Sequence, residues 1–430
     1  MNSEPLNVAI DAQISPKTAG GVAQVLLGLV HSLGRLEDDP STNYFIVVGS
    51  QAERDFLQPY LGNNQQFAIK PRTLTQRLQR LVTGARKSIA RRFADRDNYS
   101  ELSLPISDGY LESLGTDVVH FPHQRFALCS LPSIYNPHDL QHLHFPQFFS
   151  PSELAGRDFV YRSGCQLAHT VAVSSRWVKE DIIKHYQVDP AKIQIIPWAP
   201  PTEAYNDPSP GDLDAVQEKY ALAKPFVLYP AMTWPHKNHL RLLEALAILR
   251  DSHDIRLHLV FTGSLLQPYS SSIQKRVSEL ELNSQVTFLG FVSDIDLRAL
   301  YRLSQFLVMP SLFESDSSPI YEAWLEGTPI VCSNVTSLPV QVMDAAILFD
   351  PYDPESIANA MRRVATDSSL RQDLTAYGYL RVKDYDWNRT AKAYRAVYRR
   401  AAGRLLSEED RWLLEWDWME RPMRLVGARA

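Results

Sequence analysis

Short apolar runs alternate with stretches of helical periodicity over most of the chain. In the second half, the apolar runs that predict buried strands lie at residues 226–229, 256–262, 286–289, 306–309, 330–332 and 346–349. The helical patterns between these runs lie at 239–250, 269–282 and 294–303. Strands that alternate with helices predict a parallel, doubly wound sheet, so the predicted fold class is α/β.

The first half repeats this alternation. Its predicted strands lie at 6–10, 44–48, 117–121, 133–136, 170–174 and 192–197, and its predicted helices at 22–33 and 176–186. Six prolines between Pro197 and Pro225 indicate a crossing between two domains. We therefore predict doubly wound domains at 1–200 and 225–395, with a linker at 201–224 and terminal helices at 396–430 that return to the first domain.

A predicted strand–loop–helix unit begins at Phe306. The strand is followed by a polar loop at 311–318, and Pro319 suits the first turn of the next helix. Either Ser317 or Ser318 can cap this helix. The free N–H groups and the positive end of the helix dipole make such a helix start suitable for binding phosphate.

Two carboxylates flank this predicted phosphate site, Glu314 on the loop and Glu322 in the helix. A carboxylate at Glu322 can accept hydrogen bonds from ribose hydroxyls, and Glu314 can face the sugar that the phosphate carries. The spacing alone favours the simpler interpretation, two solvated carboxylates on a loop and a helix.

Further candidate residues follow strands. Because ligands bind at the carboxyl ends of parallel strands, Lys237, Gly263 and Glu314 are expected on one rim of the second sheet. Lys237 can supply positive charge to a diphosphate, or it is an exposed lysine at a helix start. In the first half, Gly20 and Gly21 follow a strand and precede a helix, which indicates either a phosphate loop or a flexible turn.

Composition and charge narrow the class of protein. The chain has 430 residues, of which 45% are hydrophobic, and a net charge of −5, which argues against a general nucleic-acid binder. Its three cysteines lie far apart in sequence and form no metal-ligand pair or disulfide framework, so a reducing, cytoplasmic setting is expected. No signal peptide and no apolar run of ~18 residues is visible.

Residues 70–96 have a different charge balance from the rest of the chain. They hold nine basic residues and one acid, Asp95, in the pattern of an amphipathic helix. This segment is either a solvated helix packed on its domain or a contact with an anionic membrane surface or an acceptor diphosphate. A cytoplasmic protein with peripheral attachment to a membrane is therefore an open expectation.

Histidines and aspartates were considered as metal ligands. Five histidines lie between His120 and His144, but their spacings fit no standard ligand set. Asp294-Ile295-Asp296 has the DxD spelling, yet it precedes a predicted helix, where it fits a cap. We therefore predict no metal site, no required divalent cation and no cofactor.

The two glutamates belong to a longer pattern, Pro310-Ser-Leu-Phe-Glu314, Pro319, Glu322-Ala323, Gly327-Thr-Pro329-Ile-Val and Ser333-Asn334. This pattern resembles the signature of the retaining glycosyltransferase family 4, and the resemblance extends from about Leu6 to Tyr398. It implies the GT-B fold, in which two Rossmann-like domains face a cleft. The first domain would bind the acceptor, and the second would bind the nucleotide sugar.

The resemblance also implies residue roles in the second domain. Glu314 would contact the transferred sugar, and Glu322 would bind the nucleotide ribose. The donor loop is Ser315-Asp316-Ser317-Ser318, where many members carry glycines that wrap the diphosphate. Lys237 matches the position of a phosphate-binding lysine, whereas Met232 occupies the position of a second cation.

In the first domain, the resemblance concerns two segments. Pro137-His138-Asp139-Leu140 matches a motif that would bring His138 near the donor sugar, where a neutral or protonated imidazole could bond a hydroxyl or the leaving phosphate. The loop with Gly20 and Gly21 would reach the donor phosphate or the acceptor.

The function that the resemblance implies is a retaining transfer of a hexose, with mannose as the first choice. The donor would be a GDP- or UDP-sugar, and the acceptor a glycan or a lipid-linked saccharide in cell-surface polysaccharide or glycoconjugate synthesis. Two alternatives stay open: a nucleotide-sugar epimerase or phosphorylase on the same fold, and a non-catalytic protein that binds sugar nucleotides.

Overall fold

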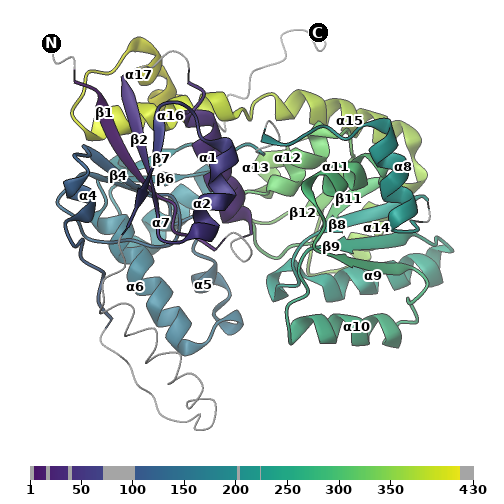
Figure 1. The fold of residues 1–430 in the computed structure, drawn as a ribbon. Helices are drawn as coiled ribbons and strands as arrows, with labels where there is room; N and C mark the ends of the chain where they lie inside the picture. Colours follow the sequence, from purple (N-terminus) through teal and green to yellow (C-terminus); the bar gives the residue numbers. More distant parts are fainter. Residues whose placement is uncertain are drawn as a thin grey trace, which may run out of the picture. The chain divides into compact units, whose positions relative to one another are not determined.

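Two parallel sheets, of seven and six strands, form the framework of the chain (Figure 1). The computed structural model describes residues 4–15, 20–36, 41–70, 102–200, 204–222 and 224–416. The chain divides into a first unit, made of residues 1–172, 182–194 and 391–414, and a second unit, made of 173–181, 195–390 and 415–430.

The first sheet has the strand order β3-β2-β1-β4-β5-β6-β7. Its strands are β1 (Leu6–Asp11), β2 (Thr42–Val48), β3 (Gln65–Ile69), β4 (Val118–Phe121), β5 (Ser133–Tyr135), β6 (Thr170–Val173) and β7 (Ile193–Ile195). The pairs from β3 through β6 are parallel. The chain leaves β1 toward β2 and β3 and then returns to β4, so the topological switch point lies between β1 and β4.

Helices connect these strands. They are α1 (Gly21–Leu33), α2 (Gln51–Leu57), α4 (Tyr110–Ser113), α5 (Gln141–His144), α6 (Pro151–Leu167) and α7 (Arg176–Tyr186), with 3₁₀ turns η1 (Gln58–Tyr60), η2 (Pro146–Phe148) and η3 (Pro190–Lys192). A capping box begins α6, because the Ser150 side chain accepts a hydrogen bond from the Glu153 N–H and Glu153 bonds back to the Ser150 N–H.

The end of the chain contributes to the core of the first unit. Most of helix α16 (Trp387–Ala401) and nearly all of α17 (Glu408–Glu415) belong to this unit. The hydroxyl of Tyr398 lies 2.7 Å from His120 Nδ1, and His120 Nε2 lies 2.6 Å from Asn136 Oδ1. Asn136 in turn donates to Tyr394, so a buried polar network joins α16 to β4 and to the residue after β5.

The second sheet has the strand order β10-β9-β8-β11-β12-β13. Its strands are β8 (Phe226–Pro230), β9 (His258–Thr262), β10 (Val286–Gly290), β11 (Phe306–Met309), β12 (Ile330–Ser333) and β13 (Ile347–Phe349), and every pair is parallel. The chain runs outward from β8 to β10 and returns to β11, so the switch point lies between β8 and β11.

Helices lie on both sides of this sheet, with α9 and α10 on one side and α11 and α12 on the other (Figure 1). The helices are α8 (Pro210–Lys219), α9 (His239–His253), α10 (Tyr269–Glu279), α11 (Asp294–Leu303), α12 (Ser318–Leu325), α13 (Leu338–Val342), α14 (Pro354–Thr366) and α15 (Ser368–Val382), with the 3₁₀ turn η5 (Pro235–Lys237). Coverage of both faces explains why the strands read as continuous apolar runs.

The predicted fold class is confirmed: two doubly wound α/β sheets are present. Strand β3 and helix α6 were not predicted from the sequence. Among the helices of the described residues, none is both long enough and apolar enough to cross a bilayer.

Candidate functional site

The switch point of the second sheet brings together two of the predicted site residues. The loop after β8 carries Lys237, and the loop after β11 carries Glu314. Their side chains form an ion pair, with Lys237 Nζ 2.5 Å from Glu314 Oε1, and both groups are largely shielded from solvent. In such a shielded site, the lysine can bind an anionic group of a ligand. The carboxylate can accept hydrogen bonds from hydroxyl groups of the same ligand.

Several bonds fix the backbone of the turn that carries Lys237. Tyr229 on β8 donates its hydroxyl to the Lys237 carbonyl at 2.7 Å. The next residue, Asn238, adopts a left-handed conformation with φ 59° and donates its side-chain amide to the carbonyls of Pro310 and Pro351 at 2.9 and 2.8 Å. Asparagine tolerates this conformation better than most residues, so the local sequence suits the turn.

The backbone of Glu314 is held from the segment after β12. The hydroxyls of Thr336 and Ser337 both donate to the Glu314 carbonyl, the latter at 2.9 Å. The Glu314 N–H donates to the Thr336 hydroxyl at 3.2 Å. These bonds fix the position of the loop backbone beside the carboxylate that meets Lys237.

Helix α12 begins at the predicted place. Ser317 is its N-cap, but the Ser317 side chain makes no bond to the helix. Instead the Ser317 backbone is clamped by Gln341, whose side chain accepts from the Ser317 N–H at 3.1 Å and donates to the Ser317 carbonyl at 2.9 Å. Because no side chain caps α12, the first N–H groups, such as that of Ser318, suit an anion.

Glu322 lies on α12 in an acidic environment. Its Oε2 accepts a hydrogen bond from the Tyr301 hydroxyl on α11 at 2.8 Å. Burial, helped by the neighbouring carboxylates of Asp294 and Glu326, raises the pKa of Glu322 to about 7 against the opposing effects of the Tyr301 bond and the charge of Arg298. Among the described residues, no hydrogen bond or ion pair joins Glu322 to the Lys237–Glu314 pair.

Asp316 has a position that the sequence did not indicate. The Tyr321 hydroxyl on α12 donates to Asp316 Oδ1 at 2.6 Å, and Asp316 Oδ2 is buried. Burial raises the pKa of Asp316 to about 7 against the effect of the Tyr321 bond. The negative charge of Asp316 is thus reduced near neutral pH, and its carboxyl group is bonded to α12. Ser315, in the same loop, is half-buried.

Gly263 ends β9 on the same rim. It has a φ of 101°, and a Cβ there would lie 2.8 Å from the backbone carbon of Ala231. The Gly263 N–H also donates to the Gly290 carbonyl at 2.7 Å. Glycine is therefore required for the close approach of the loops that follow β8, β9 and β10.

The two histidines that flank Lys237 in sequence, His236 and His239, do not act as cations at pH 7. Burial holds the pKa of His236 well below its usual value and lowers that of His239 to about 3. His239 is fully buried, and its ring packs against Tyr229 and Phe261 with centroids 5.0 and 5.2 Å away. Both imidazoles are neutral at pH 7.

The DxD spelling is also explained by local structure. The N-cap of α11 is Ser293, not Asp294, because the Ser293 side chain accepts from the Asp296 N–H. Asp296 pairs with Lys219 on α8 at 2.6 Å, and Asp294 is the carboxylate that lies near Glu322. The expected cap is thus one residue earlier than predicted.

His138 lies at the carboxyl edge of the first sheet. Its Nε2 donates to the Pro122 carbonyl at 2.9 Å, and its backbone has a φ of 67°. Burial lowers the pKa of His138 to about 4, against the effect of the Pro122 bond. The imidazole is therefore neutral at pH 7, with its proton on Nε2, which decides between the two charge states that the sequence left open.

The switch point of the first sheet holds a second polar pair. Asp11 ends β1, and its Oδ2 lies 3.5 Å from His123 Nε2, in the loop after β4. Burial would raise the pKa of Asp11, but His123 and the bonds from Gln13 lower it overall. Gly20 precedes α1 in the same unit, with a φ of 53°, and Gly21 is the first residue of that helix.

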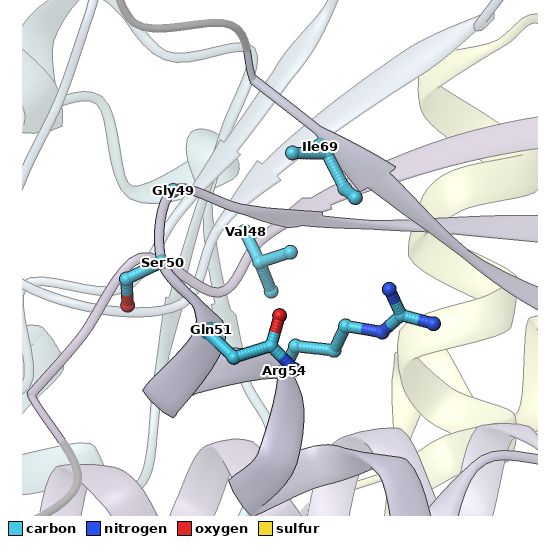
Figure 2. A pocket seen from close by; sticks show the side chains of 6 residues that line it. All are labelled: Val48, Gly49, Ser50, Gln51, Arg54 and Ile69. Atoms are coloured by element: carbon cyan, nitrogen blue, oxygen red, sulfur yellow. The ribbon is translucent and has the colours of Figure 1, made fainter.

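A hollow of about 360 Å³ opens at the carboxyl ends of β2 and β3 in the first unit (Figure 2). It is lined by Val48, Gly49, Ser50, Gln51, Arg54 and Ile69. Figure 2 shows the side chains of Val48, Ile69 and Arg54 around a shared space. None of these residues was singled out from the sequence.

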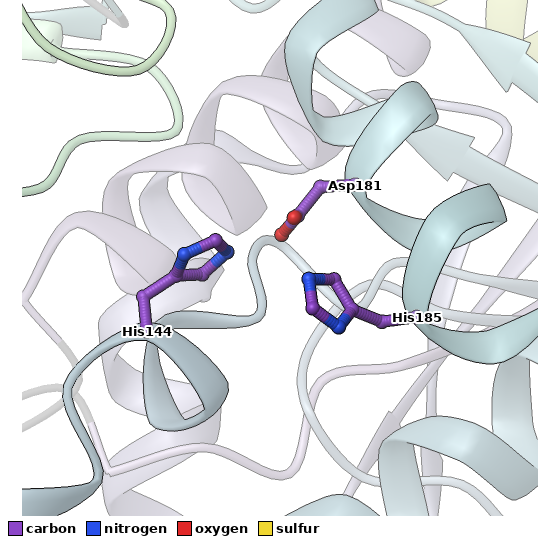
Figure 3. A group of neighbouring side chains, drawn as sticks. All are labelled: His144, Asp181 and His185. Carbon is purple, nitrogen blue, oxygen red and sulfur yellow. The ribbon is translucent and has the colours of Figure 1, made fainter.

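Three potential metal ligands also cluster among the described residues. His144 on α5 and His185 on α7 have ring centroids 5.5 Å apart, and Asp181 lies one turn before His185 on α7. One ligand atom from each residue lies within 4.8 Å of the others (Figure 3). His144 is one of the five histidines whose spacings fit no standard set of metal ligands. The sequence did not indicate this cluster, because the other two residues lie on α7, far from His144 in the chain.

Some predicted features fall outside the described residues. Only Lys70 of the basic segment 70–96 is described, and it pairs with Asp108 at 3.3 Å. The membrane contact expected from this segment remains a prediction.

Sequence reasoning missed residues that act through tertiary contacts. Tyr301, Tyr321 and Thr336 contact the predicted carboxylates or their loop, but nothing in their local sequence marks them. Asp11 and His123 carried a signal, because Asp11 directly follows one predicted strand and His123 lies two residues after another.

Family models and known proteins agree with this architecture. A model described as "Glycosyl transferases group 1" matches residues 214–381, and one described as "Glycosyltransferase Family 4" matches residues 19–203. The O-antigen chain mannosyltransferase B of Escherichia coli is 29% identical over 282 residues, which span 62% of this chain and 73% of that protein. The O-antigen chain mannosyltransferase RfbU of Salmonella typhimurium is 29% identical over 227 residues, which span 53% of this chain and 59% of that protein.

A solved structure shares the fold over most of the chain. The structure of Anabaena Alr3699/HepE in complex with UDP and glucose is similar with a TM-score of 0.64 at 16% identity, and the match covers 91% of this chain and 99% of that one. Together with the two family models, which cover both halves, this similarity identifies the fold as GT-B. The chain belongs to the group 1 glycosyltransferases of glycosyltransferase family 4, and it is a glycosyltransferase enzyme.

Proposed function

We propose that the enzyme transfers a hexose, with retention of anomeric configuration, from a nucleotide-diphosphate sugar to a glycan or lipid-linked acceptor. The observation that carries this proposal is the Lys237–Glu314 pair at the switch point of the second sheet, four residues before the uncapped start of α12. This arrangement offers a cation and free N–H groups to a diphosphate and a carboxylate to the sugar beside it.

The second unit would bind the donor. The diphosphate would lie against the start of α12, with Lys237 neutralising charge that develops on the leaving group. Glu322 would accept hydrogen bonds from the ribose hydroxyls in competition with the Tyr301 hydroxyl. The loop Ser315-Asp316-Ser317-Ser318 would contribute its backbone, since Asp316 and Ser317 are held by Tyr321 and Gln341.

Glu314 would orient the sugar and release Lys237 to the diphosphate when the donor binds. A preorganised charge of this kind contributes about 3–4 kcal/mol to the stabilisation of a transition state. We assign no covalent nucleophile. No metal is required in this scheme, because Lys237 and the helix amides provide the positive charge.

The first unit would bind the acceptor and contribute His138. As a neutral imidazole, His138 would contact the sugar rather than neutralise a phosphate. Gly20 and Gly21 would allow the start of α1 to approach a phosphate or an acceptor closely.

Mannose is the proposed sugar, and cell-surface polysaccharide is the proposed destination. Two similar proteins are named as O-antigen mannosyltransferases, which supports mannose as the transferred sugar. We propose GDP-mannose as the first donor to test. The similar structure with bound UDP and glucose supports a UDP-sugar as the other choice.

Product analysis tests the reaction type. The full chain is incubated with GDP-mannose or UDP-glucose in the presence of EDTA, and products are followed by anomer-resolved NMR. We expect slow hydrolysis of one donor to the α-anomer, and faster release of nucleotide diphosphate when a mixture of glycan acceptors is added.

The alternatives give different products. A nucleotide-sugar epimerase would convert the donor without releasing nucleotide, and a phosphorylase would form sugar phosphate in the presence of inorganic phosphate. Nucleotide binding with no turnover of any donor would favour the non-catalytic alternative and contradict the proposal.

A further inference from the structure

The hollow in the first unit has one charged wall and two apolar walls. Val48 ends β2 and Ile69 ends β3, and the Ile69 side chain is 58% exposed although it is a large hydrophobic residue. Gln51 and Arg54, both from helix α2, lie next to each other and form the polar side of the hollow (Figure 2). The volume of about 360 Å³ falls within the range of about 300–1,000 Å³ that is common for small-molecule pockets.

The backbone N–H groups at the start of α2 are not available to bind a ligand in the hollow. Glu53 accepts from the N–H groups of Gly49 and Ser50 at 2.7 and 3.0 Å, and the Ser50 hydroxyl accepts from the Glu53 N–H. This capping box satisfies the start of α2 internally. A ligand in the hollow would therefore meet side chains.

Arg54 is the cation of the hollow. Its guanidinium lies 5.6 Å from the centre of the Phe67 ring, which orients it along the sheet. Among the described residues, no carboxylate lies within ion-pair distance of it: Glu53 is used by the capping box and Asp55 accepts from Gln51 at 2.6 Å. A half-buried arginine without an ionic partner suits a bidentate anion.

Polar residues at the switch point of the same sheet adjoin the hollow through Gly49. A Cβ placed on Gly49 would lie 2.9 Å from Gln13 Oε1, so the two residues are direct neighbours on the rim. Gln13 in turn donates to Asp11 at 3.1 Å, and Asp11 pairs with His123. One line of polar groups thus runs along the carboxyl ends of β2, β1 and β4.

We propose that this hollow is a subsite for an acceptor saccharide that carries an anionic group, a phosphate or a carboxylate, and that Arg54 binds this group. The proposal rests on the proposed transferase function, and it assigns a chemical class to the acceptor. The sugar ring would lie against Val48 and Ile69, and the Ser50 hydroxyl and the Gln51 carbonyl oxygen would meet its hydroxyls.

Binding of small probes to the full chain tests the subsite. Dissociation constants are measured by ligand-observed NMR for methyl α-mannoside 6-phosphate, methyl β-glucuronoside, neutral methyl α-mannoside and inorganic phosphate. Since a hydrogen bond to a charged group contributes about 1.5–3 kcal/mol, we expect at least one anionic glycoside to bind about tenfold or more tightly than the neutral glycoside. The glycoside that binds identifies the anion as phosphate or carboxylate.

Two matched variants locate the effect. Arg54→Gln is expected to remove the preference for the anionic glycoside. Arg157→Gln is expected to keep it, although Arg157 also belongs to the first unit and also stacks on a phenylalanine, with its guanidinium 4.9 Å from the Phe149 ring. GDP and UDP affinities, measured in the same samples, should not change in either variant.

Three outcomes would overturn the proposal: unchanged anionic preference in Arg54→Gln, no preference in the unaltered chain, or inorganic phosphate binding as tightly as the phosphorylated glycoside. The last result would mean a bare anion site. The affinities for GDP and UDP test the proposed donor site independently of the glycosides. A chain that binds anionic glycosides but neither nucleotide would therefore contradict the donor site and not the subsite.

Discussion

At the residue scale, the two glutamates of the second unit have opposite surroundings. Glu314 faces a cation, because Lys237 Nζ lies 2.5 Å from it. Glu322 faces other acids and a tyrosine hydroxyl, and burial with the acids Asp294 and Glu326 raises its pKa to about 7. The first glutamate is thus held ready for a ligand, whereas the second is energetically unfavourable as a carboxylate until a hydrogen-bond donor, such as a ribose hydroxyl, approaches it.

The raised pKa of Glu322 predicts a dependence of stability on pH. The folded protein keeps a proton on this group up to about pH 7, whereas the unfolded chain releases it near its usual value of 4.5. More protons are therefore bound in the folded state between these values, so stability falls as the pH rises from about 4.5 to 7. The shift corresponds to at most about 3 kcal/mol.

Glu322→Gln should reduce this loss of stability. The free energy of unfolding is measured by urea denaturation between pH 4.5 and 8. Hydrogen exchange of β11 and β12 over the same pH range reports the stability of the strands next to Glu322. Asp316→Asn is a parallel variant, because burial also raises the pKa of Asp316 to about 7. An unchanged pH slope in Glu322→Gln would mean that its carboxyl group is solvated in the folded protein.

At the element scale, the loops that follow β8, β9 and β10 depend on one close contact of backbone. Gly263 has a φ of 101° and leaves no room for a Cβ beside Ala231. Gly263→Ala should therefore destabilise the second unit by about 2 kcal/mol or more and weaken nucleotide binding. Thermal unfolding and calorimetric titration with GDP and UDP measure these effects.

Gly211→Ala provides the control for this substitution. Gly211 lies in the first turn of α8, and the nearest atom to its added Cβ would be 3.8 Å away, so alanine should be neutral or slightly stabilising. Equal stability of both variants would contradict the role that we assign to Gly263.

Elements could be predicted where apolar runs were continuous or helices were amphipathic. Residues 294–303, 306–309 and 176–186 have the predicted bounds, because buried parallel strands and their helices give clear periods. Strand β3 (Gln65–Ile69) was missed because its polar start and exposed Ile69 dilute the apolar run. Helix α6 was missed although its capping box, Ser150 and Glu153, was readable.

At the scale of the whole molecule, the chain end completes the first unit. The hydroxyl of Tyr398 on α16 bonds to His120 on β4, and burial lowers the pKa of His120 to about 3, so this ring is neutral. His120 Nε2 donates to Asn136, so its Nδ1 is the acceptor for the tyrosine hydroxyl. Terminal helices were predicted here, but the sequence did not indicate this buried network.

Tyr398→Phe should destabilise the first unit, because it leaves His120 Nδ1 buried without a donor, at a cost of about 1–3 kcal/mol. Hydrogen exchange in β4 and β5 measures the loss. Tyr377→Phe is the control, since Tyr377 is 48% exposed. Equal protection of β4 in the two variants would contradict the structural role of the network.

The candidate site was predictable in part. The family pattern singled out Glu314 and Glu322, and the rule for parallel sheets put Lys237 and Glu314 on one rim, where they form an ion pair; their roles in binding a donor remain predictions. The structure adds that Lys237 pairs with Glu314 rather than standing alone, and that Glu322 bonds to Tyr301. Such partners come from elements far apart in the chain, so no local pattern could have revealed them.

Nucleotide affinity tests the central claim most directly. Calorimetric titrations with GDP and UDP compare the unaltered chain with Lys237→Ala, Glu322→Ala and the control Lys275→Ala, an exposed lysine of α10. Because hydrogen bonds to charged groups contribute about 1.5–3 kcal/mol, we predict that the nucleotide bound by the unaltered chain binds about tenfold or more weakly to the first two variants and equally well to the control. Unchanged affinity in both Lys237→Ala and Glu322→Ala would contradict the proposed donor site.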